Sequence, residues 1–147
     1  MRAPVTALGS RRGAAIVEFA AVCVLLILVV LAAIELSRMA LVANAVANSA
    51  RAGVRYAVTH GSDRTGTGST GPSGPGNNPT QVVRVVKGFA GAAPISQANL
   101  TVTVTYPDAS NTPGSRVDVK VVYAYDPLTA LPLSVNLGST SEGVITY

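Results

Sequence analysis

The sequence predicts an α+β fold: a long N-terminal helix that starts in a membrane, then a small head with a short helix and a two- or three-stranded antiparallel sheet. Three observations predict it. Residues 13–34 form an apolar run whose one charged residue is Glu18. Residues 39–58 contain no proline and continue with helical periodicity. Two valine- and threonine-rich segments, 100–106 and 116–125, alternate apolar and polar side chains with the period of a strand.

The apolar run is long enough to cross a bilayer. Ala14 to Ile34 is 21 residues, and a transmembrane helix needs about 20. Three arginines precede the run, so the positive-inside rule predicts a cytoplasmic N-terminus and a head beyond the inner membrane. Three fates are open for this segment: a signal peptide removed near Ala43-Asn44-Ala45, a permanent anchor, or a prepilin-type leader. The three arginines are Arg2, Arg11 and Arg12.

Glu18 is the residue that a plain anchor does not need. A carboxylate in a membrane helix costs about 2.5–3.5 kcal/mol on insertion scales. Residues 11–19, RRGAAIVEF, resemble the processing site of type IV prepilins, which are cut after a glycine and carry glutamate at the fifth mature position. The resemblance implies cleavage between Gly13 and Ala14, and packing of Glu18 and Phe19 against neighbouring helices. The alternative is a chance carboxylate that snorkels to the headgroups.

The stretch after the membrane run predicts an amphipathic continuation of the helix, so that the helix covers 14–58 and residues 1–13 form a cytoplasmic leader. Arg51, Arg55 and Tyr56 are expected to contact the head or a neighbouring subunit, with a solvated face as the alternative. The polar stripe is Asn44, Asn48, Arg51 and Arg55, and the apolar face is Met39, Val42, Val46, Gly53 and Ala57.

Residues 59–79 predict a flexible loop, since 61–79 hold six glycines and three prolines. His60, at its edge, is expected to be exposed. Residues 80–147 form the predicted extracytoplasmic head. It starts with a helix over 80–91, continues with a hairpin of 100–106 and 116–125 around the turn sequence PDASNTPGS, and ends with a third strand over 143–147. The apolar face expected for the short helix is Val82, Val83, Val86, Phe89 and Ala90.

Composition argues against several function classes. The net charge is +4, but three of those charges precede the apolar run, and no basic run is interleaved with aromatic residues, so no nucleic-acid partner is expected. The single cysteine, Cys23, allows no internal disulfide and no zinc cluster. No nucleophile–base constellation, metal cluster or phosphate loop is recognisable, so we expect neither an enzyme nor a cofactor or small-molecule substrate.

The order of segments along the chain resembles that of the TadE-like family. The order is a leader ending at Gly13, the apolar helix, the segment Arg51–Ala57 (RAGVRYA), the loop, the short helix and the hairpin closing at Tyr125. Members of this family are minor pilins (pseudopilins) of the tight-adherence (Tad/Flp) pilus. The resemblance implies prepilin peptidase, other pilins and Tad assembly proteins as partners, besides membrane lipid, and a role in surface attachment or secretion. The alternative function is an anchored extracytoplasmic binding domain unrelated to pili, which would need neither Gly13 nor Glu18.

Overall fold

A computed structural model describes residues 9–75, 79–128 and 135–146. The chain divides into two units, 1–37 and 38–147. The elements follow in the order α1, a 3₁₀ turn at Gly68–Thr70, α2, a second 3₁₀ turn at Gln97–Asn99, β1, β2 and β3. This is the α+β fold that the sequence predicts.

Helix α1 spans Gly9–Val58. It ends at the expected residue but begins before Ala14, so the backbone is already helical on both sides of Gly13. By length and composition its stretch from Gly13 onward can cross a membrane, which indicates single-pass anchoring. Apart from the half-buried Cys23, its apolar side chains from Ile16 to Ile34 are exposed in the chain alone, as lipid-facing or subunit-facing side chains would be.

The outer part of α1, residues 38–58, has the two faces that its periodicity predicts. The four residues of the polar stripe are all exposed. Val42, Val46, Gly53 and Ala57 are buried, and Met39 is half-buried against the head's core. The polar face of this segment therefore lies in solvent, and its apolar face serves as one wall of the head's core.

Helix α2 spans Thr80–Ala90, close to the predicted range. Val82, Val86 and Ala90 are buried, as expected. The expectation for Phe89 is wrong, because this side chain is 60% exposed. Val86 of α2 lies so close to Gly53 of α1 that a Cβ atom there would clash with it, whereas the phenylalanine ring lies outside this contact.

The head's sheet has three antiparallel strands in the order β1-β2-β3: Leu100–Thr105, Arg116–Tyr125 and Val135–Val144. The hairpin of β1 and β2 is confirmed, with Val102 opposite Val121 and Val104 opposite Val119. The range predicted for the third strand, 143–147, is wrong: the strand runs from Val135 to Val144, residues 145 and 146 follow it, and Tyr147 lies outside the described residues. It pairs along the whole of β2, from Tyr125–Val135 to Arg116–Val144.

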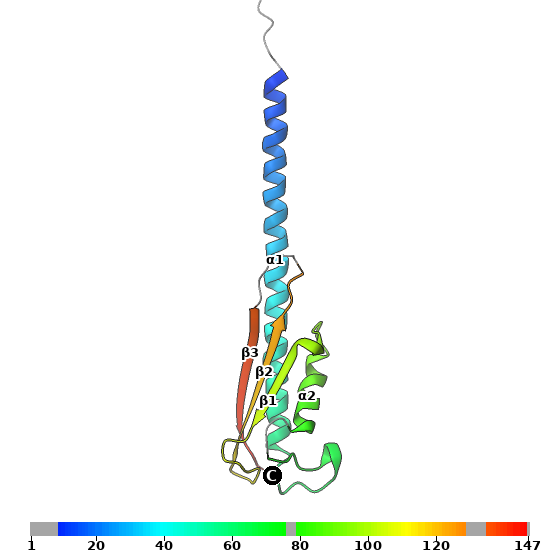
Figure 1. The fold of residues 1–147 in the computed structure, drawn as a ribbon, viewed down its shortest axis with the longest axis vertical. Helices are drawn as coiled ribbons and strands as arrows, with labels where there is room; N and C mark the ends of the chain where they lie inside the picture. Colours follow the sequence, from blue (N-terminus) through cyan, green and yellow to red (C-terminus); the bar gives the residue numbers. More distant parts are fainter. Residues whose placement is uncertain (1–8, 76–78, 129–134, 147) are drawn as a thin grey trace, which may run out of the picture. The chain divides into compact units, whose positions relative to one another are not determined.

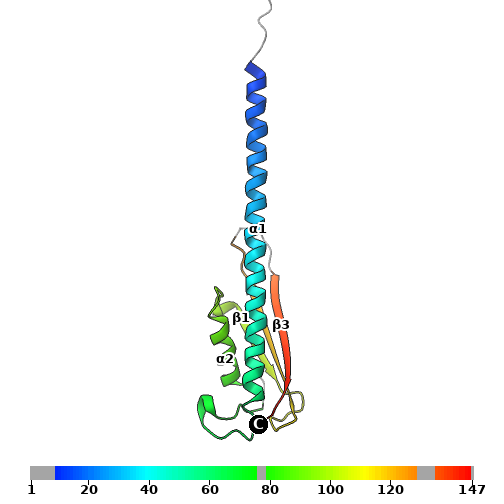
Figure 2. The same ribbon diagram turned by 180° about the vertical axis from the view of Figure 1, so that it is seen from behind.

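Figures 1 and 2 show the sheet on one side of the outer part of α1, with α2 beside β1 and β3 at the opposite edge. The buried face of the sheet alternates strictly with an exposed or half-exposed face along β2. Its valines meet those of α1 and α2 in one core cluster, which also includes Tyr106, Tyr123 and Tyr125. Within the same unit, the Arg38 guanidinium lies 5.6 Å from the centroid of the Tyr125 ring.

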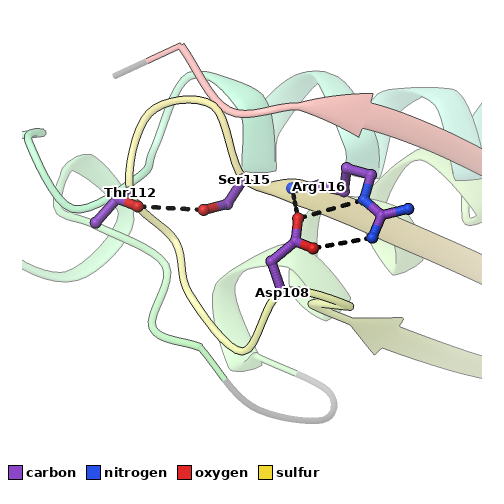
Figure 3. Close-up of polar contacts among 4 residues, drawn as sticks. All are labelled: Asp108, Thr112, Ser115 and Arg116. Carbon is purple, nitrogen blue, oxygen red and sulfur yellow. Dashed lines mark hydrogen bonds and ion pairs between the residues drawn. The ribbon is translucent and has the colours of Figure 1, made fainter.

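The turn between β1 and β2 is held by one carboxylate (Figure 3). Asp108 accepts hydrogen bonds from the backbone N–H of Arg116 at 2.9 Å and from its guanidinium, with Nη2 to Oδ1 at 2.9 Å. These hydrogen bonds hold the pKa of the Asp108 carboxyl below its usual value. Thr112 and Ser115 pair across the same turn, with their hydroxyl oxygens 3.1 Å apart.

The described part of the glycine-rich loop, 59–75, is tied to the head by hydrogen bonds that its composition does not reveal. Ser73 is fully buried, and its hydroxyl donates to the carbonyl of His60 at 3.0 Å. The same hydroxyl lies 3.0 Å from the phenolic oxygen of Tyr106. The Asn111 amide donates to the Ser73 carbonyl at 2.7 Å, and the Ser62 N–H donates to the Asn111 carbonyl at 2.8 Å.

Candidate functional site

Two places carry all but one of the residues that the sequence singles out, the exception being Tyr56, and the two places belong to different units. The first is the N-terminal part of α1, where Gly13, Ala14, Glu18 and Phe19 are all exposed. Ala14 and Glu18 are four residues apart and so share one face of the helix. A Cβ atom added at Gly13 would meet nothing within 4 Å. Packing within the described part of the chain therefore does not explain why position 13 is a glycine.

The second place is a groove between the outer part of α1 and the C-terminal end of α2, two helices that lie side by side in Figure 2. Its volume is about 660 Å³, and it is open to solvent. We call it the helix-pair groove. Its lining residues are Ala45, Asn48, Arg51, Ala52, Arg55, Phe89, Ala92 and Ala93.

The groove combines an apolar floor with positive charge. Ala45 and Ala52 on α1 and Ala92 and Ala93 after α2 have side chains too short to fill the space, and the exposed Phe89 ring forms one wall. The guanidiniums of Arg51 and Arg55 stand at its border, both exposed, with Arg51 donating to the side-chain oxygen of Asn48 at 3.3 Å. An apolar ligand surface with negative charge at its edge suits this arrangement.

Tyr56 does not line the groove. Its hydroxyl donates to the carbonyl of Ser69 at 2.8 Å, so it helps to hold the loop after α1. Burial raises the pKa of the Tyr56 phenol, and the charges of Arg84 and Arg64 act in the opposite direction. The His60 ring stacks on the Tyr56 ring, with centroids 3.9 Å apart.

His60 itself differs from expectation, since it is half-buried rather than exposed. Its Nδ1 atom lies 2.8 Å from the Tyr56 carbonyl oxygen and 3.0 Å from the Thr59 hydroxyl. The contacts around this ring come from the end of α1 and its own neighbours, which makes His60 part of the helix terminus. Among the described residues, no group of three or more His, Cys, Asp or Glu side chains could hold a metal ion.

The sequence pointed to only part of the helix-pair groove. Arg51 and Arg55 stood out as charges on a helix face, but the alanines and Phe89 did not. Ala45 and Ala93 are far apart in the sequence, and only the packing of α2 against α1 brings them to one hollow. Phe89 lies at the edge of the apolar face of α2, where a large side chain can turn outward. This position is the feature of the sequence that could have predicted its exposure.

These features define a class: an α+β protein with an N-terminal apolar helix long enough to cross a membrane and a head whose core includes residues 42–57 of α1. The comparison with protein families then gives a more specific result for one segment of the chain. A family model described as TadE-like protein matches residues 13–55, which run from the glycine before the apolar stretch to Arg55 in the groove. The resemblance to the TadE-like family, which is associated with the Tad pilus, is thus confirmed over this segment. Neither the curated proteins nor the solved structures gave a match to the chain.

Proposed function

We propose that this chain is a minor pilin, or pseudopilin, that serves as a membrane-anchored structural component in the assembly of a tight-adherence pilus used for surface attachment or secretion. It acts through packing, as an assembly protein and not as an enzyme. The observation that carries the proposal is the pair Gly13 and Glu18 at prepilin spacing, inside the segment that matches the TadE-like family.

The surroundings of Gly13 support a processing role. A glycine inside a helix costs about 0.8–1 kcal/mol relative to alanine, and here no neighbouring atom requires it. The glycine is better explained by an enzyme that must approach the backbone closely than by the fold of this chain. We infer that a prepilin peptidase cuts after Gly13 in the cytoplasmic membrane, and that the head lies on the far side.

Cleavage would change the charge at the membrane surface. The leader carries all three arginines that precede the apolar helix, and its removal creates a new α-amino group at Ala14. When such helices pack side by side, the Glu18 carboxylate of one subunit pairs with the Ala14 amine of the next. A buried charge is tolerated when it is paired, and the pairing sets the axial register of the subunits.

Intact mass of the membrane-extracted protein tests the proposal. The chain is produced with and without a prepilin peptidase, as the original sequence and as Gly13→Ala. We expect loss of residues 1–13 only when peptidase and Gly13 are both present. Cleavage near Ala45 would indicate an ordinary signal peptide, and an uncut chain with active peptidase would indicate a permanent anchor. Either result would overturn the pilin proposal in favour of an anchored or secreted binding domain.

A further inference from the structure

The helix-pair groove leaves an aromatic side chain in water beside an apolar hollow. Phe89 is 60% exposed although its neighbours along α2, Val86 and Ala90, are buried. Beside it the hollow is lined by alanines of α1 and of the segment after α2. Apolar surface around a concave site is the usual signature of a place where another molecule docks.

The two arginines at the border of the groove repel each other in the isolated chain, which lowers the stability of the helix that carries them. Arg51 and Arg55 are four residues apart on α1, and like charges at this spacing destabilise a helix. Within 9–75, 79–128 and 135–146, neither guanidinium makes an ion pair with a carboxylate, and the guanidinium of Arg51 donates a hydrogen bond to the side-chain oxygen of Asn48. A carboxylate placed between the two guanidiniums would relieve this repulsion, so the complementary partner is acidic.

The walls of the groove also favour a helical partner over an extended strand. Its residues on α1 and Phe89 on α2 lie in helices, whose backbone N–H and C=O groups are already paired. An extended strand would find few partners there for its own backbone, whereas a helix satisfies its backbone internally. Arg55 follows Ala45 by ten positions along α1, a distance of roughly 15 Å at 1.5 Å per residue, which matches about three turns of a docked helix.

We propose that the helix-pair groove binds one amphipathic helix of another protein. The apolar side chains of that helix lie against Phe89 and Ala52, and its Asp or Glu carboxylates pair with Arg51 and Arg55. This interaction lies in the head and does not require cleavage after Gly13. It therefore goes beyond the proposed function and can fail or succeed independently of it.

The test is site-specific photo-crosslinking of the full-length chain in the membranes of its native host. A benzophenone amino acid replaces Phe89, and in a matched control it replaces Thr140, which is exposed on β3. The crosslinked peptide is identified by mass spectrometry. We expect one partner protein at position 89, absent at position 140, with the crosslink inside a helical segment that carries carboxylates.

Charge variants then test the chemistry of the contact. Arg51→Glu combined with Arg55→Glu should lower the crosslink yield at least about tenfold, and Arg51→Lys with Arg55→Lys should keep most of it. Reversing the partner's carboxylates to lysine should restore the yield of the double glutamate variant. Near-ultraviolet circular dichroism of the tyrosines checks that each variant is folded.

Four results would overturn the inference: crosslinks to a second copy of this chain, crosslinks to lipid, a yield no higher than at Thr140, or a yield that charge reversal leaves unchanged. Intact mass measured on the same samples reports processing at Gly13 separately. A failure of the groove proposal is thereby distinguished from a failure of the pilin proposal.

Discussion

A Cβ atom at Gly53 would lie 2.5 Å from Cγ2 of Val86, closer than real Cβ contacts allow. At Gly53, α1 therefore lies in close contact with both α2 and β2, since the same atom would lie 3.1 Å from Cγ1 of Val119. Valine is stiff at χ1 and cannot turn away easily. This approach fixes α2 beside α1 and so shapes the helix-pair groove.

Gly53→Ala should destabilise the head. Overpacking a core costs about 1–3 kcal/mol, which outweighs the gain of about 0.8–1 kcal/mol in helix propensity. Thermal unfolding of the full chain in detergent, followed by tyrosine near-ultraviolet circular dichroism, measures the effect. All five tyrosines lie at position 56 or later, so the signal reports on the head and not on the membrane segment.

Gly88→Ala is the matched control. It is also a glycine-to-alanine change in a helix, but a Cβ there would meet nothing within 4 Å. This variant should be as stable as the original chain or more stable, by up to about 1 kcal/mol. If Gly53→Ala also raises the melting temperature, the close approach of α1 and α2 is not what the fold requires at position 53.

The contrast between β1–β2 and β3 shows what the sequence could predict. The hairpin is visible because Val and Thr alternate, and the outer helix is visible because its polar stripe recurs at helical spacing. Strand β3 lacks such a signal. Its inward positions include Ser139, Ser141 and Gly143, and a Cβ at Gly143 would lie 2.6 Å from Cγ1 of Val54. At Gly143 the strand packs so close to α1 that a larger residue would clash, and the apolar residues of this face, Val135 and Leu137, lie at its other end.

The two candidate sites also differ in how far the sequence alone predicts them. Gly13 and Glu18 form a linear motif, so spacing alone identifies them. The helix-pair groove is assembled from two helices and the segment after α2, and alanines carry no functional signal in a sequence. The anchoring of the loop through Ser73 was hidden for a similar reason, because its partners Tyr106 and Asn111 lie far along the chain.

Ser73→Ala should cost more stability than Tyr106→Phe. The Ser73 hydroxyl donates to the His60 carbonyl, so it is the Tyr106 phenol that donates to Ser73. Removing the serine hydroxyl leaves the buried phenol without this acceptor, a loss of about 1–3 kcal/mol, whereas removing the phenol costs about 0.5–1.5 kcal/mol. Denaturant unfolding of both single variants and the double variant measures the coupling between the two side chains. If the two losses of stability simply add, no stabilising hydrogen bond joins Ser73 and Tyr106.

Asp108 should make the head's stability depend on acidic pH. Its pKa is lowered in the folded chain by the hydrogen bonds from Arg116. Its contribution is therefore present above the ordinary aspartate pKa of about 3.9 and is lost as pH falls through the lower folded value. Asp108→Asn should be less stable than the original chain at neutral pH, and the difference should shrink toward pH 2.

The control for that series is Asp126→Asn, because Asp126 is exposed and makes no hydrogen bond within the described part of the chain. At neutral pH, Asp126→Asn should change the stability of the head much less than Asp108→Asn does. Melting temperatures between pH 2 and pH 7 compare the three chains. An unchanged difference between Asp108→Asn and the original chain across this range would mean that the carboxylate is not what holds the turn.

Glu18→Gln should insert into the membrane normally yet fail to assemble. The amide keeps the size of the side chain but cannot neutralise the Ala14 amine of a neighbouring subunit. Removing one partner of a buried ion pair costs about 3–5 kcal/mol, so incorporation into pili or pilin complexes should fall at least about tenfold. Quantitative mass spectrometry of sheared pili and of membrane fractions measures both steps. Val17→Ala, an exposed neighbour on the same helix, is the control that should assemble normally, and normal assembly of Glu18→Gln would refute the pairing.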